Sequence, residues 1–157
     1  MKKFELTTDF ITVFGIKLFR IKALVEFGTV KAGDLGGYIE KEENLDHDGN
    51  AWVSGDAQVY GNAWVSGDAR VYGDALVSGD AQVYGDADYA CVKGFGTKYR
   101  NTTFFREKDG TVKVSCGCFL DTIPEFRKQV ENTRSGKIAK EYLMIADLME
   151  LHFSKDE

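Results

Sequence analysis

Residues 49–90 read GNAWVS-GDAQVY-GNAWVS-GDARVY-GDALVS-GDAQVY-GDADYA, seven hexads of the pattern Gly-[Asp/Asn]-Ala-x-Val-[Ser/Tyr] that fails only at the end of the last copy. Because six is a multiple of two, each position of the hexad returns to the same face of a strand. The valines suit a strand and should point inward with the small alanines. Gly-Asp and Gly-Asn tolerate the positive φ angles of sharp corners. Each hexad therefore predicts one strand and one corner of a β-solenoid.

A second regularity, which repeats every second hexad, indicates the number of sides. Serine and tyrosine alternate at the last hexad position, as Ser54, Tyr60, Ser66, Tyr72, Ser78 and Tyr84. A three-sided coil, with three hexads in each turn, stacks each tyrosine on a serine and places Arg70 over Trp52, where a cation–π contact is favourable. A two-sided coil, with two hexads in each turn, would instead stack Trp52 on Trp64. We favour the three-sided coil and keep the two-sided coil as the alternative.

The repeat resembles the hexapeptide-repeat family of left-handed parallel β-helices. That family places an aliphatic residue first and a small residue four positions later, as Val53 and Ala57 do here, and the match continues to Val83 and Ala87. The resemblance implies a left-handed parallel β-helix with three hexads in each turn. It also implies association as a homotrimer, because short helices of this family often assemble around an axis parallel to the helix.

Residues 1–48 are predicted to form an N-terminal β segment and a degenerate coil. Two stretches rich in β-branched and aromatic residues, 10–14 and 17–24, predict strands with a turn or bulge at Gly15-Ile16. Residues 30–39 look like decayed repeat. Such a coil would cap the solenoid, whose open end otherwise exposes core and unpaired strand edges.

Residues 91–157 are predicted to form a hairpin followed by two helices. The hairpin covers residues 102–119, with Asp109-Gly110 in its turn. Thr122 and Glu125 have the spacing of a capping box, which starts the first helix. The second helix is predicted for residues 137–153, with Ile138, Tyr142, Ile145 and Met149 at helical spacing.

The whole arrangement also resembles small hexapeptide-repeat proteins encoded by bacteriophages and prophages. The shared features are Gly-Asp-Leu-Gly-Gly at 33–37, Asn44-Leu45 before the repeats, and Cys-Gly-Cys-Phe at 116–119 before two helices. The resemblance spans nearly the full chain but brings no activity with it. It implies a protein of the bacterial cytoplasm.

Composition excludes several classes of protein. The chain has 157 residues and a net charge of −5, which disfavours a general nucleic-acid binder. The charge is −7 over residues 1–90 and +2 over residues 91–157. No apolar stretch approaches the roughly 18 residues of a membrane helix. We expect no signal peptide, and three cysteines, an odd number, fit a reducing cytoplasm.

Acyl transfer is the enzyme activity to weigh first. Many left-handed β-helix proteins are acyltransferases that use an acyl-CoA donor and a general-base histidine near a coil boundary. His47 precedes the regular coils and is the candidate base in that case, although a solvated turn histidine is the favoured interpretation. His152 lies near the end of the second predicted helix, where a surface or packing role is expected.

No metal or cofactor site is predicted. Cys116 and Cys118 would share a strand face near Cys91, but a zinc site usually has a fourth ligand and CxxC spacing. The corner carboxylates lack the calcium-binding repeat pattern and are interpreted as turn residues. They are Asp56, Asp68, Asp74, Asp80 and Asp86.

The aromatic residues of the hexads are the candidate binding residues. They are expected to point outward, where large apolar side chains are costly unless something covers them. Subunit packing in a trimer explains them, and so does a recognition surface, because Trp and Tyr are frequent binding residues. Arg70 and the tyrosines are expected to line clefts between trimer subunits, which suit a small anionic ligand. The candidate set is Trp52, Tyr60, Trp64, Arg70, Tyr72 and Tyr84.

The sequence therefore favours a non-enzymatic, oligomeric binding protein. A counter-defence role is a specialisation of it, by inhibition of a host immune protein or sequestration of a signalling nucleotide. The alternatives are an acyltransferase that uses His47 and a purely structural solenoid.

Overall fold

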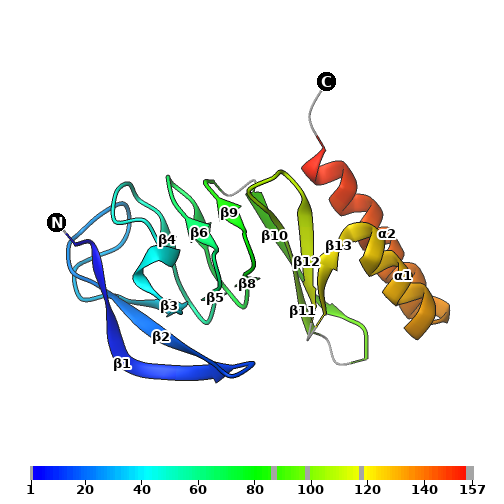
Figure 1. Cartoon of the computed structure of the whole chain (residues 1–157), viewed down its shortest axis with the longest axis horizontal. Coiled ribbons are helices and arrows are strands. Elements are labelled where there is room, and N and C mark those ends of the chain that lie inside the picture. Colours follow the sequence, from blue (N-terminus) through cyan, green and yellow to red (C-terminus); the bar gives the residue numbers. More distant parts are fainter. Residues whose placement is uncertain (1, 86–87, 98–99, 117–118, 155–157) are drawn as a thin grey trace. The chain divides into compact units, whose positions relative to one another are not determined.

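The computed structural model describes residues 2–85, 88–97, 100–116 and 119–154, which are mainly β with two helices. The chain divides into two compact units, residues 1–86 and 87–157, here called the solenoid unit and the C-terminal unit (Figure 1). Within the described part of the chain, neither helix is long and apolar enough to span a membrane.

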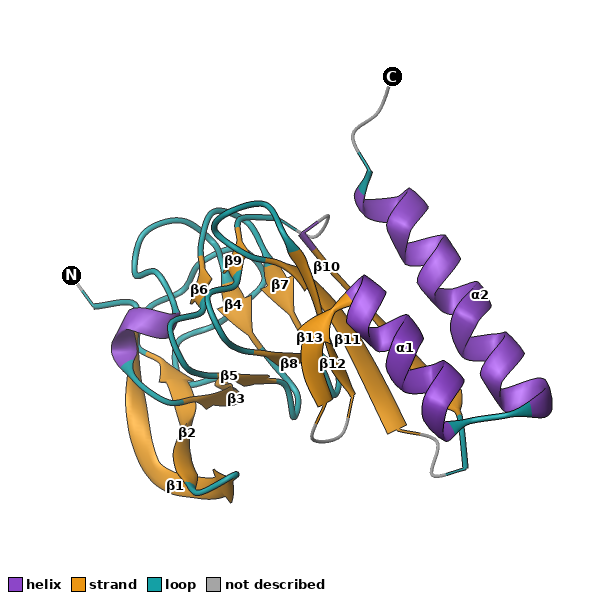
Figure 2. Ribbon diagram, turned by 45° about the vertical axis from the view of Figure 1, so that its right-hand side comes forward, coloured by secondary structure: helices purple, strands orange, loops and turns teal. Residues whose placement is uncertain are grey.

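The hexads form short strands that stack in parallel. Each strand pairs with the strand three hexads later, so that β4 joins β7, β5 joins β8 and β6 joins β9 (Figure 2). Trp52 lies opposite Arg70, and Trp64 lies opposite Gln82, which confirms the three-sided coil and excludes the two-sided one. The strands are β4 (Trp52–Val53), β5 (Gln58–Val59), β6 (Trp64–Val65), β7 (Arg70–Val71), β8 (Leu76–Val77) and β9 (Gln82–Val83).

Three faces result, which we call face A (β5 and β8), face B (β6 and β9) and face C (β4 and β7). The valine of every strand is fully buried, and so are the repeat alanines between residues 51 and 81, to within 1%. At several corners the alanine amide donates to the carbonyl of the preceding serine or tyrosine, and the intervening glycine has a positive φ, as at Gly55 (63°) and Gly79 (66°). The hexad is therefore one side of the coil, as its chemistry predicts.

A degenerate first coil precedes the regular ones, as expected. β3 (Leu35–Ile39) pairs in parallel with β5, and Leu45 bridges to Val65 on face B. Gly36 and Gly37 are required here, because a Cβ on either would lie within 2.6 Å of a backbone oxygen of the next coil. The sheet order on face A is β1-β2-β3-β5-β8.

The N-terminal hairpin extends the sheet of face A. Its strands β1 (Phe4–Val13) and β2 (Ile16–Ala23) are antiparallel. The turn was expected at Gly15-Ile16 but consists of Phe14 and Gly15, with Ile16 already in β2. Both turn residues have positive φ, 51° and 81°.

Asn44 closes the first coil at the end of the 3-10 helix η1 (Glu42–Asn44). Its Nδ2 donates to the carbonyls of Gly61 at 3.2 Å and Ala63 at 2.9 Å, and its Oδ1 accepts from the amide of Lys41 at 3.0 Å. The side chain is fully buried. These hydrogen bonds explain why an asparagine stands at position 44, before the repeats.

The C-terminal unit is a four-stranded antiparallel sheet with two helices. The predicted hairpin is confirmed as β11 (Arg100–Arg106) and β12 (Val112–Cys116), and two strands that sequence reasoning missed flank it: β10 (Tyr89–Phe95) and β13 (Phe119–Thr122). Tyr89 and Ala90, which the hexad pattern includes in its seventh copy, lie in β10, while Asp86 and Ala87 lie outside the described residues.

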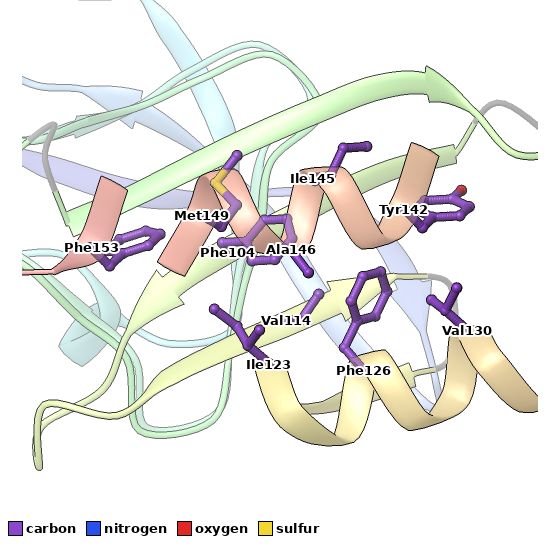
Figure 3. Packing of buried hydrophobic residues seen from close by; sticks show 10 residues of the cluster. All are labelled: Phe104, Val114, Ile123, Phe126, Val130, Tyr142, Ile145, Ala146, Met149 and Phe153. Atoms are coloured by element: carbon purple, nitrogen blue, oxygen red, sulfur yellow. The ribbon is translucent and has the colours of Figure 1, made fainter. Parts of the chain in front are cut away.

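The helices are α1 (Ile123–Thr133), capped by Thr122 as predicted, and α2 (Gly136–Phe153). They contribute to one hydrophobic cluster with the sheet residues Phe104 and Val114 (Figure 3). The helix residues of the cluster are Ile123, Phe126, Val130, Tyr142, Ile145, Ala146, Met149 and Phe153.

Candidate functional site

The predicted binding residues do not form one surface. Consecutive hexads lie on consecutive faces of a three-sided coil, so aromatic residues that follow each other in the sequence point in different directions. Trp52 and Arg70 lie on face C, and Trp64 lies on face B. Tyr60, Tyr72 and Tyr84 follow strands on faces A, C and B respectively.

Face C is covered by the segment between β2 and β3. The Phe27 ring meets the Trp52 ring edge-on, with centroids 5.3 Å apart, and Thr29 Oγ1 accepts a hydrogen bond from Arg70 at 2.8 Å. Trp52 is only 4% exposed. The expectation that the Trp52 side chain is exposed to a partner is therefore wrong, because Phe27 of the same chain packs against it. The Arg70 guanidinium is also engaged within the chain and is only partly exposed.

The tyrosines separate into different environments. Tyr60 is half-buried, and this burial raises the pKa of its hydroxyl. Tyr72 is 63% exposed at the corner between faces C and A. The serines one coil away from Tyr60 and Tyr84, Ser78 and Ser66, are buried, as expected if each tyrosine packs over a small residue.

Face B brings two of the predicted residues together. The rings of Trp64 and Tyr84, on neighbouring coils, are 6.0 Å apart between centroids and inclined at 82°. The Tyr84 hydroxyl donates to Oε1 of Gln82, which lies opposite Trp64. Trp64 is 37% exposed and Tyr84 51%. This aromatic pair, here called the face B site, is the candidate functional site.

Acidic residues border the face B site. Asp80 lies at the corner before β9, and Asp68 lies at the corner after β6; both are exposed. Each carboxylate accepts from an asparagine one coil earlier, Asp68 from Asn50 at 3.4 Å and Asp80 from Asn62 at 3.2 Å. The Asn50 amide is neutral, so its hydrogen bond does not cancel the charge of Asp68. The sequence indicated turn residues here and gave no sign that they flank an aromatic pair.

His47 has a structural position. Its Nδ1 accepts a hydrogen bond from the Lys3 amide at 3.0 Å, and its ring stacks on Phe4 at 4.2 Å between centroids. A neutral imidazole whose Nδ1 accepts carries its proton on Nε2. A general base needs an unprotonated nitrogen directed at substrate, and in this tautomer the unprotonated nitrogen is bound to the chain's own N-terminal segment.

The corner that holds His47 is longer than the others. Leu45 and Trp52 are seven positions apart, whereas the corresponding residues of the regular coils, such as Val59 and Trp64, are five apart. The two extra positions make room for the N-terminal segment to contact the corner. This spacing is visible in the sequence and could have indicated that the corner with His47 packs against another segment of the chain.

Lys3 is a buried cation that sequence reasoning missed. The residue is 3% exposed, and its Nζ donates to the carbonyl of Ala51 at 2.6 Å and lies 4.6 Å from the centre of the Phe27 ring. Burial lowers the pKa of Lys3 to about 8, while the charges of Asp46 and Asp48 oppose the lowering. Lys3 ties the start of β1 to the first coil and is not accessible as a reactive amine.

The cysteines do not assemble a metal site among the described residues. Cys116 Sγ accepts from Thr102, and Cys91 Sγ lies 3.6 Å from Oγ1 of Thr103. Because Thr102 and Thr103 are consecutive in β11, the two thiols lie on opposite faces of the sheet. Cys118 lies outside the described residues. In the described ranges no three His, Cys, Asp or Glu side chains are close enough to hold a metal ion, and His152 is an exposed residue of α2.

Comparison with known proteins identifies the repeat. A family model described as the YdcK beta solenoid repeat matches residues 57–69 and 69–85. The matched residues lie in the regular coils and make up less than half of the chain, so the likeness concerns the β-solenoid repeat. No curated protein matches the chain.

Proposed function

We propose that this chain is a non-enzymatic binding protein whose partner covers the face B site. The observation that carries the proposal is the exposed pair of Trp64 and Tyr84 on one face of the solenoid. Exposed apolar surface is costly in water, and Trp and Tyr are frequent binding residues in protein interfaces. Trp64 lies in β6 and Tyr84 directly follows β9, so the backbone at both residues is already ordered, and little backbone conformational entropy is lost when a partner binds.

The proposal includes a left-handed hexapeptide-repeat helix that assembles as a homotrimer in the cytoplasm of a bacterial host. Coils of three hexads, with one hexad on each side, support the handedness, because they fit the family that the sequence resembles. The exposed Tyr72, at a corner away from face B, supports a second contact surface for the neighbouring subunit.

A counter-defence role in a phage or prophage setting is the specialisation we propose for this binding. The support for this setting is the resemblance in sequence at residues 33–37, 44–45 and 116–119, of which Gly36, Gly37 and Asn44 shape the first coil. Of the two forms of counter-defence, inhibition of a host protein is favoured over sequestration of a nucleotide. Arg70, the residue expected to bind an anion, already donates to Thr29.

The acyltransferase alternative has no observation in its favour. His47 accepts a hydrogen bond from the Lys3 amide and stacks on Phe4, which supports a structural role for this residue. A purely structural solenoid leaves the exposure of Trp64 and Tyr84 unexplained.

Photo-cross-linking in cells tests the binding function. Benzoylphenylalanine in place of Trp64 should give a discrete covalent adduct under ultraviolet light. The same residue in place of Tyr72, which is at least as exposed but lies off face B, should not give that adduct. Native mass spectrometry of the gently purified protein then reports the number of subunits and any retained ligand. Absence of an adduct at position 64 would exclude a partner on face B, and a CoA-sized ligand would favour the acyltransferase.

A further inference from the structure

We propose that the face B site binds a basic segment of a partner protein, through arginine or lysine side chains placed against Trp64 and Tyr84. This inference rests on the binding function proposed above and names the chemistry of the partner. Three features of the solenoid unit lead to it: the aromatic pair, the acidic corners beside the pair, and the charge of the surrounding coils.

The aromatic pair offers ring surface to a cation. Trp64 and Tyr84 are 37% and 51% exposed and lie on neighbouring coils of face B, so ring surface of both is open to solvent on the same side of the coil. A cation above a ring face is attracted by the negative face of the ring quadrupole, most strongly for Trp. The solenoid unit uses this contact elsewhere, with Arg20 4.4 Å and Lys17 4.8 Å from the centres of aromatic rings.

The corners beside the pair supply the opposite charge. Asp68 and Asp80 are exposed on the two edges of face B, and Asp48 is exposed at the first-coil corner on the same edge as Asp68. A carboxylate oxygen has two lone pairs, so the donor from Asn50 leaves Asp68 capacity for a further hydrogen bond. A guanidinium or ammonium group on the rings can therefore pair with an adjacent carboxylate.

The negative charge of the coils favours a basic partner over an acidic one. Residues 40–85 contain nine acidic and only two basic side chains, Lys41 and Arg70. Arg70 lies on face C, where it donates to Thr29. An anionic partner would be repelled by this surface. A second copy of face B would also bring like charges together, which disfavours that contact.

The test uses the full-length protein and a fluorescein-labelled peptide of alternating arginine and glycine, followed by anisotropy. Asp68→Asn should weaken binding about threefold, since it removes one charge while keeping an oxygen acceptor at this position. Trp64→Leu should weaken binding about fivefold, because it keeps apolar area but loses the ring, and Trp64→Phe should weaken it less. Asp74→Asn, the same hexad position away from face B, is the matched control.

Three outcomes would overturn the inference. The first is equal weakening by Asp74→Asn, which would indicate unspecific charge attraction. The second is tighter binding of the matched glutamate–glycine peptide. The third is the absence of arginine-peptide binding while benzoylphenylalanine at position 64 still captures a partner, which would leave the proposed binding function intact. If position 64 also captures nothing, both proposals fail.

Discussion

The choice between asparagine and aspartate in each hexad follows from stacking at the corners. Successive coils place the second hexad residues in columns, with a spacing of about 4.8 Å between strands. Two carboxylates at that distance repel each other. A column is therefore more stable when its first residue is an asparagine, whose side-chain amide donates a hydrogen bond to the aspartate of the next coil. The columns are Asn50 above Asp68, Asn62 above Asp80, and Asp56 above Asp74, where Nη2 of Arg20 lies 3.7 Å from Asp56.

This stacking predicts the effect of Asn62→Asp. The change replaces a hydrogen bond of 3.2 Å to Asp80 by two facing carboxylates. We expect the free energy of unfolding to fall by about 0.5–1 kcal/mol at low salt, and by less in about 0.5 M NaCl, because salt screens exposed charges. Urea denaturation at both salt concentrations measures this. Asn62→Ser, which adds no charge, should show no salt dependence, and a salt-dependent loss in that variant would contradict the explanation.

Lys3 predicts a dependence of stability on pH. In the folded protein its pKa is about 8, below its ordinary value of 10.5. Between these two values the unfolded chain binds more protons than the folded protein, so stability must rise with pH in this window. Relative to Lys3→Met, the free energy of unfolding of the wild-type protein should be constant below about pH 7 and rise by up to about 3 kcal/mol towards pH 10. Urea denaturation between those values measures the difference, and a flat difference would show that Lys3 is solvated.

At the scale of elements, the N-terminal hairpin contains a strained turn. Phe14 has a φ of +51° and is 63% exposed, so its ring contributes little packing to offset the left-handed backbone. Asparagine tolerates this conformation at the first position of a two-residue hairpin turn. Phe14→Asn should therefore raise the free energy of unfolding by about 0.5–1 kcal/mol.

The matched control for the hairpin is Phe14→Ala. Alanine removes the same ring but keeps the steric cost of positive φ, so this variant should gain much less than Phe14→Asn. Thermal unfolding of the three proteins measures the order. Equal increases in stability in both variants would show that the effect comes from loss of the exposed ring and not from relief of backbone strain.

The repeat made the solenoid predictable, because each hexad contains its own strand, corner and core residue. The stacking of Trp52 on Arg70 followed from the three-sided coil, in which residues 18 positions apart lie opposite each other. The strands β10 and β13 could not be predicted in this way, since their residues have no period and their pairing depends on β11 and β12. The positions of these strands in the sheet are set by contacts between strands, and a local sequence pattern does not report such contacts.

The candidate site was predictable only in part. The residue types of the Trp64–Tyr84 pair were identified, and the stacking of every third hexad brings their coils together. The burial of Trp52 was not predictable, because the covering residues Phe27 and Thr29 lie in an irregular segment far from it in the sequence. The role of Lys3 was hidden for the same reason, since its acceptor Ala51 lies in a later coil.

At the scale of the whole molecule, the chain contains two separate hydrophobic interiors. The solenoid unit buries columns of valine and alanine within its coils. The C-terminal unit buries a hydrophobic cluster between its sheet and helices (Figure 3). Among the described residues, none belongs to both sets. We therefore expect each interior to stabilise its own unit, and loss of packing in one to leave the backbone hydrogen bonds of the other intact.

Phe126→Ala tests this separation. Phe126 is 3% exposed, and its ring lies within 6.0 Å of the rings of Phe104, Phe119 and Tyr142, so truncation should cost about 3–5 kcal/mol. Hydrogen exchange read by mass spectrometry should show faster exchange in β10–β13, α1 and α2 and unchanged protection in β4–β9. The converse variant Val65→Ala should affect the solenoid strands alone. If both variants accelerated exchange everywhere, the chain would unfold as one cooperative unit and the two interiors would not be independent.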